Sequence, residues 1–198
     1  MTAPPASPSE VLDFWFGAPG SPEAAGPRPE WFAKSVAFDA RVRARFLATV
    51  EAAERGALSG WAGPGVPAAT ALAFVLVCDQ FPRNLFRGQA RAFGLDAAAL
   101  AAARTLVARG DDACLPVVRR VFAYLPFEHS ESIDDQRESL RLFASIRNDP
   151  TAGTAWDYAV RHAQVIERFG RFPHRNAALG RTGTPAEIDF LGQPGSRF

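Results

Sequence analysis

The sequence has no excess of charge of either sign. Its 198 residues include 22 lysines and arginines and 21 aspartates and glutamates, so the formal net charge is +1. Proteins that bind nucleic acids or anionic membranes usually show a clear basic excess. We therefore expect neither a nucleic acid nor a membrane as a partner.

Cysteine is scarce, and no targeting or spanning segment is evident. Cys78 and Cys114 lie 36 positions apart without a C-x-x-C pair, and Cys78 falls in an apolar run, which favours a buried free thiol. The first residues have neither a basic start nor an apolar core, so they do not resemble a secretory signal. The longest apolar run, 68–78 interrupted only by Thr70, is too short to span a bilayer. We expect a cytoplasmic protein.

Lysine is almost missing, because Lys34 is the single lysine and the other 21 basic residues are arginines. Biased codon usage explains this in a chain so rich in alanine. Arginine is nevertheless the side chain best suited to hold a carboxylate or phosphate through two parallel hydrogen bonds.

Strand signals are also nearly absent, whereas helix start and stop signals are frequent. Ser7, Pro8 and Glu10 form a capping-box pattern before a short helix that should end at Gly17. Residues 18–29 read as an exposed loop rich in proline and glycine. Apolar residues then recur at helical spacing over 38–53, and Gly56 is expected to end that helix.

The middle of the chain predicts a buried helix. It should begin at Pro67 and end at Pro82, and because 71–77 are apolar on every face, we place it at the centre of the fold. Further helices are expected near 95–109, 115–123, 133–146, 153–168 and 185–191, the last with a second capping box at Thr184 and Glu187. The prediction is an all-α fold, a stack of antiparallel helical hairpins forming a single domain over 1–198.

Three segments combine aromatic, charged and helix-ending residues: Asp79–Gly88, Tyr124–Glu131 and Arg168–Asn176. Together with 14–17 (Phe-Trp-Phe-Gly) and 179–181 (Leu-Gly-Arg), they resemble the bacterial family known as domain of unknown function 924. The resemblance covers about 9–191 and departs mainly in the loop after Gly17 and at Gly183, where a hydroxyl residue is more typical of the family. It implies an α-α superhelix of the tetratricopeptide-like type, and it implies no biochemical function.

Asp79 is expected at the C-terminal end of the buried helix, where the helix dipole disfavours a carboxylate. It should therefore have a cationic partner, for which Arg83, Arg87 and Arg175 are the candidates. Two interpretations stay open, a buried ion pair that fixes the turn or a carboxylate held in a binding site. The arginines could likewise cap helix carbonyls or form an anion pocket.

His162 shares a helix face with apolar residues and should point into the interior, as a core histidine or as a ligand or proton shuttle. Glu128, His129 and Glu131 lie beside an expected helix start, where the dipole alone explains acidic residues. With His162 and His174 they could furnish a metal site, but they lack H-E-x-x-H or any spacing diagnostic of zinc. We assign no metal ligands from sequence and leave cofactors open.

Other chemistries lack support, because the chain has no phosphate-binding loop, dinucleotide motif or G-x-S-x-G. The two turns 81–84 and 172–176 echo each other in combining Phe-Pro with a basic residue and asparagine. We predict that a ligand-binding set converges on one cleft: Asp79, Arg83, Asn84, His129, His162, His174, Arg175 and Asn176. The favoured function is a polar pocket for a small anionic ligand, with catalysis left open; the alternatives are a module that binds a protein partner in a groove and a purely structural role for these motifs.

Overall fold

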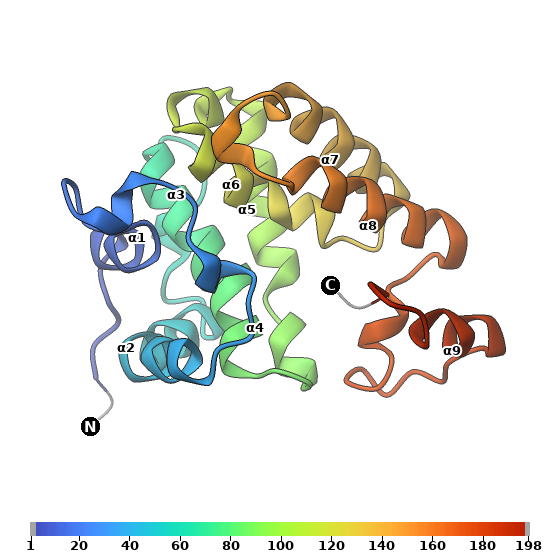
Figure 1. Ribbon diagram of the computed structural model, residues 1–198. Coiled ribbons are helices and arrows are strands. Elements are labelled where there is room, and N and C mark those ends of the chain that lie inside the picture. Colours follow the sequence, from blue (N-terminus) through green and yellow to red (C-terminus); the bar gives the residue numbers. More distant parts are fainter. Residues whose placement is uncertain (1–2, 197–198) are drawn as a thin grey trace.

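The computed structural model describes residues 3–196, and within that range every regular element is helical (Figure 1). The predicted all-α fold is confirmed. Helix α1 (Pro8–Phe16) begins with the expected capping box, in which Ser7 and Glu10 satisfy each other's backbone N–H groups. It ends at Gly17, whose φ of 88° and whose approach to the backbone of Ala24 leave no space for a Cβ atom.

The loop over 18–29 is largely exposed but is anchored to α1. It contains the 3₁₀ turn η1 (Pro22–Ala25) and leads into η2 (Pro29–Trp31). The Arg28 guanidinium donates hydrogen bonds to the carbonyls of Phe14 and Trp15, and the Trp31 indole N–H also donates to the Trp15 carbonyl. These bonds satisfy carbonyls at the end of α1 that have no partner within the helix.

The central helix does not end at Pro82, contrary to the sequence prediction. Helix α3 (Ala68–Val75) continues through one π-helical turn, η4 (Leu76–Gln80), into α4 (Phe81–Leu85). A proline inside an α-helix lacks an N–H group and collides with the carbonyl four residues earlier. The wider π turn directly before Pro82 explains how the helix continues past it. Complete burial of Leu72, Val75 and Leu76 confirms the central position.

The later helices largely follow the predicted ranges: α5 (Asp96–Ala108), α6 (Val117–Glu128), α7 (Ile133–Ile146), α8 (Ala155–Phe169) and α9 (Pro185–Leu191). Helix α6 is the exception, since it runs past the expected end near residue 123 and includes Pro126. Leu125 and Phe127 on either side of this proline are buried, so tertiary packing holds the extra turn in place. Glu128 therefore ends a helix instead of standing before one.

Helix α2 (Val36–Glu54) packs on α4, α1 packs on α3, and α3 packs on α5; from there α5, α6, α7 and α8 each pack on the next (Figure 1). The result is a stack of helical hairpins. Short 3₁₀ turns connect them: η3 (Ser59–Trp61), η5 (Ala90–Phe93), η6 (Asp111–Cys114), η7 (Pro150–Ala152) and η8 (Pro173–Arg175).

One core runs from α1 to α8 and is rich in aromatic rings, among them Trp15, Phe81 and Phe122. A small second cluster, Val165, Ile166 and Phe172, joins α8 to the turn at η8. No helix within 3–196 is both long and apolar enough to cross a membrane.

Candidate functional site

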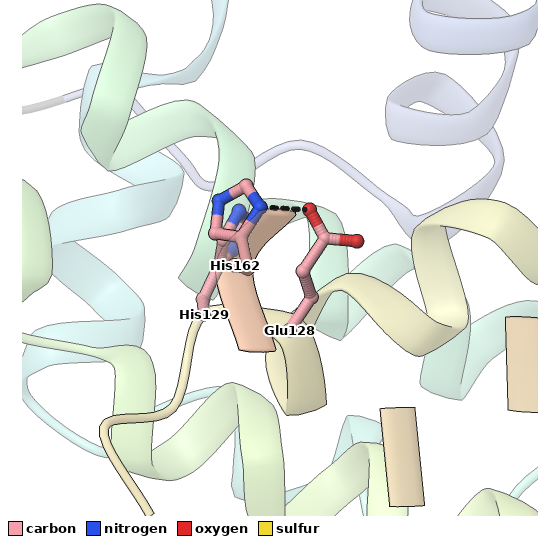
Figure 2. Close-up of side chains that lie close together, drawn as sticks. All are labelled: Glu128, His129 and His162. Carbon is pink, nitrogen blue, oxygen red and sulfur yellow. Dashed lines mark ion pairs between the residues drawn. The ribbon is translucent and has the colours of Figure 1, made fainter. Parts of the chain in front are cut away.

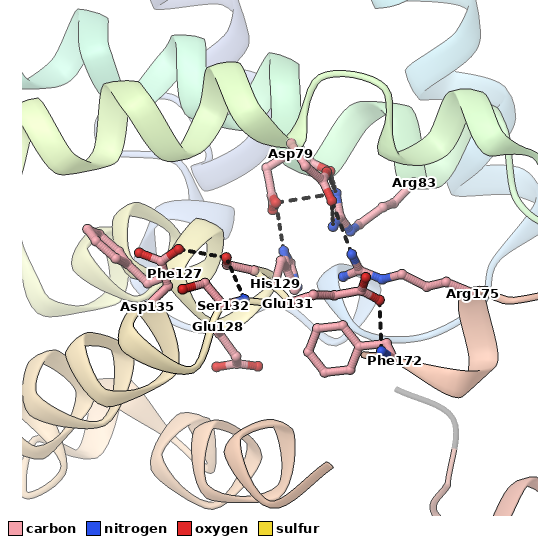
Figure 3. A network of polar contacts seen from close by, with 12 residues as sticks. Asp79, Arg83, Phe127, Glu128, His129, Glu131, Ser132, Asp135, Phe172 and Arg175 are labelled. Carbon is pink, nitrogen blue, oxygen red and sulfur yellow. Dashed lines mark hydrogen bonds and ion pairs between the residues drawn. The ribbon is translucent and has the colours of Figure 1, made fainter. Parts of the chain in front are cut away.

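The three polar segments meet where the π turn, the C-terminal end of α6 and η8 come together (Figure 3). Asp79 lies in the π turn, and its Oδ1 is 2.6 Å from Nδ1 of His129, which caps α6. Oδ1 also lies 3.3 Å from the guanidinium of Arg83, one turn further along the central helix. Of the three arginines considered as partners for Asp79, Arg83 is therefore the one that pairs with it.

Asp79 is completely buried. Burial alone would raise the pKa of its carboxyl group, but Arg83 and His129 outweigh that effect and hold the pKa well below its usual range. Since the helix continues beyond Asp79, burial explains its need for a cation, and the helix-end argument made from sequence is wrong. Gln80 completes the set by donating to Oδ2 at 2.5 Å.

A carboxylate that the sequence analysis missed, Asp96, joins the two arginines of the site. Arg83 donates two hydrogen bonds to Asp96, of 2.7 and 3.0 Å, and Arg175 reaches the same carboxylate at 3.4 Å. Asp96 is the first residue of α5, where an acidic residue is expected from the helix dipole alone. No sequence signal distinguished it from an ordinary helix start.

Arg175 is only 6% exposed, and its guanidinium contacts two rings, 4.7 Å from the centroid of Phe93 and 4.6 Å from that of Phe172. Burial and the neighbouring charge of Arg83 lower the pKa of Arg175 to about 10. The group remains charged at neutral pH. Among the described residues, its Nε–H donates to no hydrogen-bond acceptor.

A second carboxylate–imidazole pair lies beside the first. Oε1 of Glu128 is 3.0 Å from Nδ1 of His162, and the rings of His162 and His129 are 6.1 Å apart (Figure 2). His162 is 4% exposed, so its side chain points inward as its helix face predicted. The two pairs place two acidic and two basic groups within reach of one another, an arrangement able to exchange protons or to hold a cation.

The protein lowers the pKa values of two imidazoles of the site, those of His129 and His174, which favours their neutral forms. Burial, followed by the charge of Arg83, lowers the pKa of His129. Burial, followed by the charge of Arg175, lowers the pKa of His174 to about 3. The His174 ring is tilted against that of Phe172, with centroids 5.6 Å apart, and Arg175 contacts the same phenylalanine.

The two asparagines of the predicted set lie in other networks. Asn84 donates to Asp39 on α2 at 2.8 Å, and Arg87 binds the same carboxylate. Asn176 accepts a hydrogen bond of 3.0 Å from Arg181. The echo between the two Phe-Pro turns therefore does not produce equivalent positions, because the first turn is helical (α4) and the second is a 3₁₀ turn (η8).

Arg181 belongs to a clamp that the sequence analysis did not predict. It donates to both oxygens of Glu131 at 2.7 and 2.9 Å, and Glu131 also accepts the backbone N–H of Phe172 at 2.7 Å. The Glu131–Phe172 bond, drawn in Figure 3, holds the segment that leads into η8, and with it Arg175, beside the end of α6. The structure thus brings together Asp79, Arg83, His129, His162, His174 and Arg175. That they bind a ligand stays a prediction.

Comparison with known proteins gives two matches. Residues 11–195 match the family model described as bacterial protein of unknown function, DUF924. The solved structure of a protein of unknown function from Agrobacterium tumefaciens, ATU0120, is 38% identical in sequence, with a TM-score of 0.79 over 93% of this chain and 96% of that one. No curated protein matches the chain.

Proposed function

The chain belongs to the DUF924 family of bacterial proteins, whose description assigns no biochemical role, and from its geometry we propose that it binds a small anionic molecule at Arg175. The observation that carries this proposal is a buried guanidinium with too few partners. Arg175 has one carboxylate contact, at 3.4 Å, while Arg83 holds the same carboxylate through two shorter bonds. A charged group with a buried N–H left unsatisfied favours an added acceptor.

The surroundings of Arg175 suit a planar anion. The guanidinium lies over the rings of both Phe93 and Phe172, and these contacts restrict its movement, so the entropy lost on binding is small. Asp79, Asp96 and Glu131 all lie close enough to raise the pKa of Arg175. Their negative charges would repel a dianion more strongly than a monoanion. We therefore propose a carboxylate of a small molecule, in preference to a phosphate, as the bound group.

The adjacent Asp79–His129 pair favours an acid–base role as a second candidate function. The 2.6 Å contact fixes the orientation of the imidazole, as in sites where a carboxylate holds a histidine for proton transfer.

We further propose a tetratricopeptide-like arrangement of the hairpins and a location in the bacterial cytoplasm. Cys78 and Cys114 are both free, which is typical of proteins from a reducing compartment. The favoured partner is the small anion. A protein segment is the alternative partner, and the near-neutral charge gives no reason to propose a nucleic acid.

Thermal unfolding in sodium acetate, sodium succinate and sodium phosphate, each against sodium chloride at equal ionic strength, tests the anion proposal. A ligand present at 100 times its Kd stabilises the folded state by about 2.7 kcal/mol, so a carboxylate should raise the Tm measurably. The Arg175→Met variant should lose this increase. Arg141→Met is the matched control, because Arg141 pairs with Glu138 on the surface of α7. This variant should keep the carboxylate-dependent increase in Tm.

Two results would contradict the anion proposal. One is a wild-type protein whose Tm does not respond to any of the three anions. The other is an Arg175→Met protein that responds as the wild type does. A response to phosphate but not to acetate or succinate would retain Arg175 as the site and reject the carboxylate.

A further inference from the structure

Glu128, His129 and His162 form a largely buried cluster that the anion proposal does not use. One carboxylate oxygen of Glu128 and one ring nitrogen of each histidine all lie within 4.8 Å of one another. Glu128 and His162 are 2% and 4% exposed. Figure 2 shows the three side chains gathered between the end of α6, which supplies Glu128 and His129, and α8, which supplies His162.

Glu128 has few polar partners for a buried carboxylate. Of the residues that the structure describes, His162 is the one that forms an ion pair with it, through Oε1. Oε2 is buried and accepts no hydrogen bond within the same described part of the chain. Nδ1 of His162 is shared, because it also lies 2.9 Å from the carbonyl oxygen of Tyr158. A buried carboxylate with a half-shared imidazole as its partner favours an additional cation.

The surrounding contacts orient the cluster. Asp79 holds Nδ1 of His129 at 2.6 Å and fixes the proton there, which leaves Nε2 as the nitrogen with a lone pair. A carboxylate behind a histidine is the usual support of a metal-binding imidazole. Gln136 donates to the carbonyls of Glu128 and Ser130, at 2.7 Å each, and so fixes the backbone that carries two of the three side chains.

From these observations we infer that Glu128, His129 and His162 bind a divalent first-row transition-metal ion such as Zn²⁺. Two imidazoles and one carboxylate match known open sites for zinc and for non-haem iron, whereas Mg²⁺ and Ca²⁺ prefer oxygen ligands alone. Ligand atoms about 2.1 Å from a tetrahedral ion lie about 3.4 Å apart, so small side-chain rotations bring the three atoms to bonding distance. A fourth position remains for water.

Titration calorimetry with zinc chloride, on protein stripped with a chelator and then dialysed, tests the inference. We expect one ion per chain at sub-millimolar affinity or tighter. Glu128→Gln and His162→Gln should each weaken binding at least about tenfold, and Asp79→Asn, which removes the support of His129, about 10- to 100-fold. Glu138→Gln is the matched control, since this glutamate lies on the surface of α7 and binds Arg141; it should bind zinc as the wild type does.

Nitrogen-15 spectra of the imidazoles test the site without any substitution. The chain has three histidines, so each ring can be followed separately. Zinc should shift the ring nitrogens of His129 and His162 and leave those of His174 nearly unchanged. Wild-type protein that does not bind zinc, zinc-induced shifts confined to His174, or unchanged affinity in folded Glu128→Gln and His162→Gln proteins would overturn the inference.

The metal and anion proposals can fail separately. Arg175 is not among the proposed ligands, and it contacts Asp96, Phe93 and Phe172. Arg175→Met should therefore bind zinc as the wild type does while losing the response to carboxylates.

Discussion

Replacing Arg175 by methionine should change stability very little, although it removes a buried ion-pair partner. Burial and the charge of Arg83 lower the pKa of Arg175 from 12.5 to about 10. At about 1.4 kcal/mol per pKa unit, the charged form is disfavoured in the folded protein by roughly 3 kcal/mol. Methionine keeps most of the apolar stem and removes this cost.

The substitution also loses stability, because it removes the contacts of the guanidinium with two aromatic rings. The guanidinium lies 4.7 Å from the centroid of Phe93 and 4.6 Å from that of Phe172. Such contacts contribute about 1–2 kcal/mol each when they are partly desolvated. Asp96 keeps its two hydrogen bonds from Arg83, so the substitution leaves no carboxylate unpaired. Gain and loss nearly cancel, and the free energy of unfolding should stay within about 1 kcal/mol of the wild-type value.

Urea unfolding followed by circular dichroism at pH 6, 7.5 and 9 measures this difference. Arg175 is charged in both the folded and the unfolded state below its folded pKa of about 10. The cost of its charge is therefore the same at all three pH values and would be relieved only above pH 10. Removing one member of a structurally required buried ion pair costs about 3–5 kcal/mol. A loss of that size would show that Arg175 is needed for folding and would refute the reasoning.

Two further substitutions test the fold. Leu76→Ala in the central helix should lower the free energy of unfolding by about 2–5 kcal/mol, because Leu76 is fully buried; a loss under about 1 kcal/mol in the same urea assay would contradict its central position. Glu187→Gln should cost on the order of 1 kcal/mol at pH 7, as for other helix-cap changes. Hydrogen bonds from Arg171 and from the Thr184 backbone lower the pKa of Glu187. Its contribution to the free energy of unfolding is therefore present above its unfolded pKa and is lost as the pH falls, so the stability difference between Glu187→Gln and wild type should shrink toward pH 3. A difference that does not depend on pH would contradict this cause.

The fold was more predictable than the site. The capping boxes at Ser7 and Thr184 and the range 133–146 were predicted correctly, because caps and helical periodicity depend on residues three or four positions apart. The predicted helix ends at Pro82 and near residue 123, shortly before Pro126, were wrong. Proline does disfavour a helix locally. At Pro82 a π turn allows the helix to continue, and at Pro126 burial of the flanking side chains does so.

The site depends on contacts between distant segments, which local patterns do not encode. Arg83 and Arg175 are 92 positions apart in the chain and meet at Asp96, which looks like any acidic residue at a helix start. Asn84, one residue after Arg83, points instead to Asp39 on α2. A change of one position along a helix turns a side chain by about 100°, so neighbours in sequence face different partners.

Sequence alone determined that this chain forms helices, where most of them begin and end, and which one is buried, since each of these follows from short-range hydrogen bonding and from the pattern of apolar residues. It also indicated that His162 points inward, and it predicted a cationic partner for Asp79, although from a helix end that the structure does not have. Tertiary structure alone decided their partners, which are Arg83 for Asp79 and Glu128 for His162. The reason is physical: helix formation is settled within a few turns, whereas partners across helices depend on how whole helices pack and on which faces they turn toward one another.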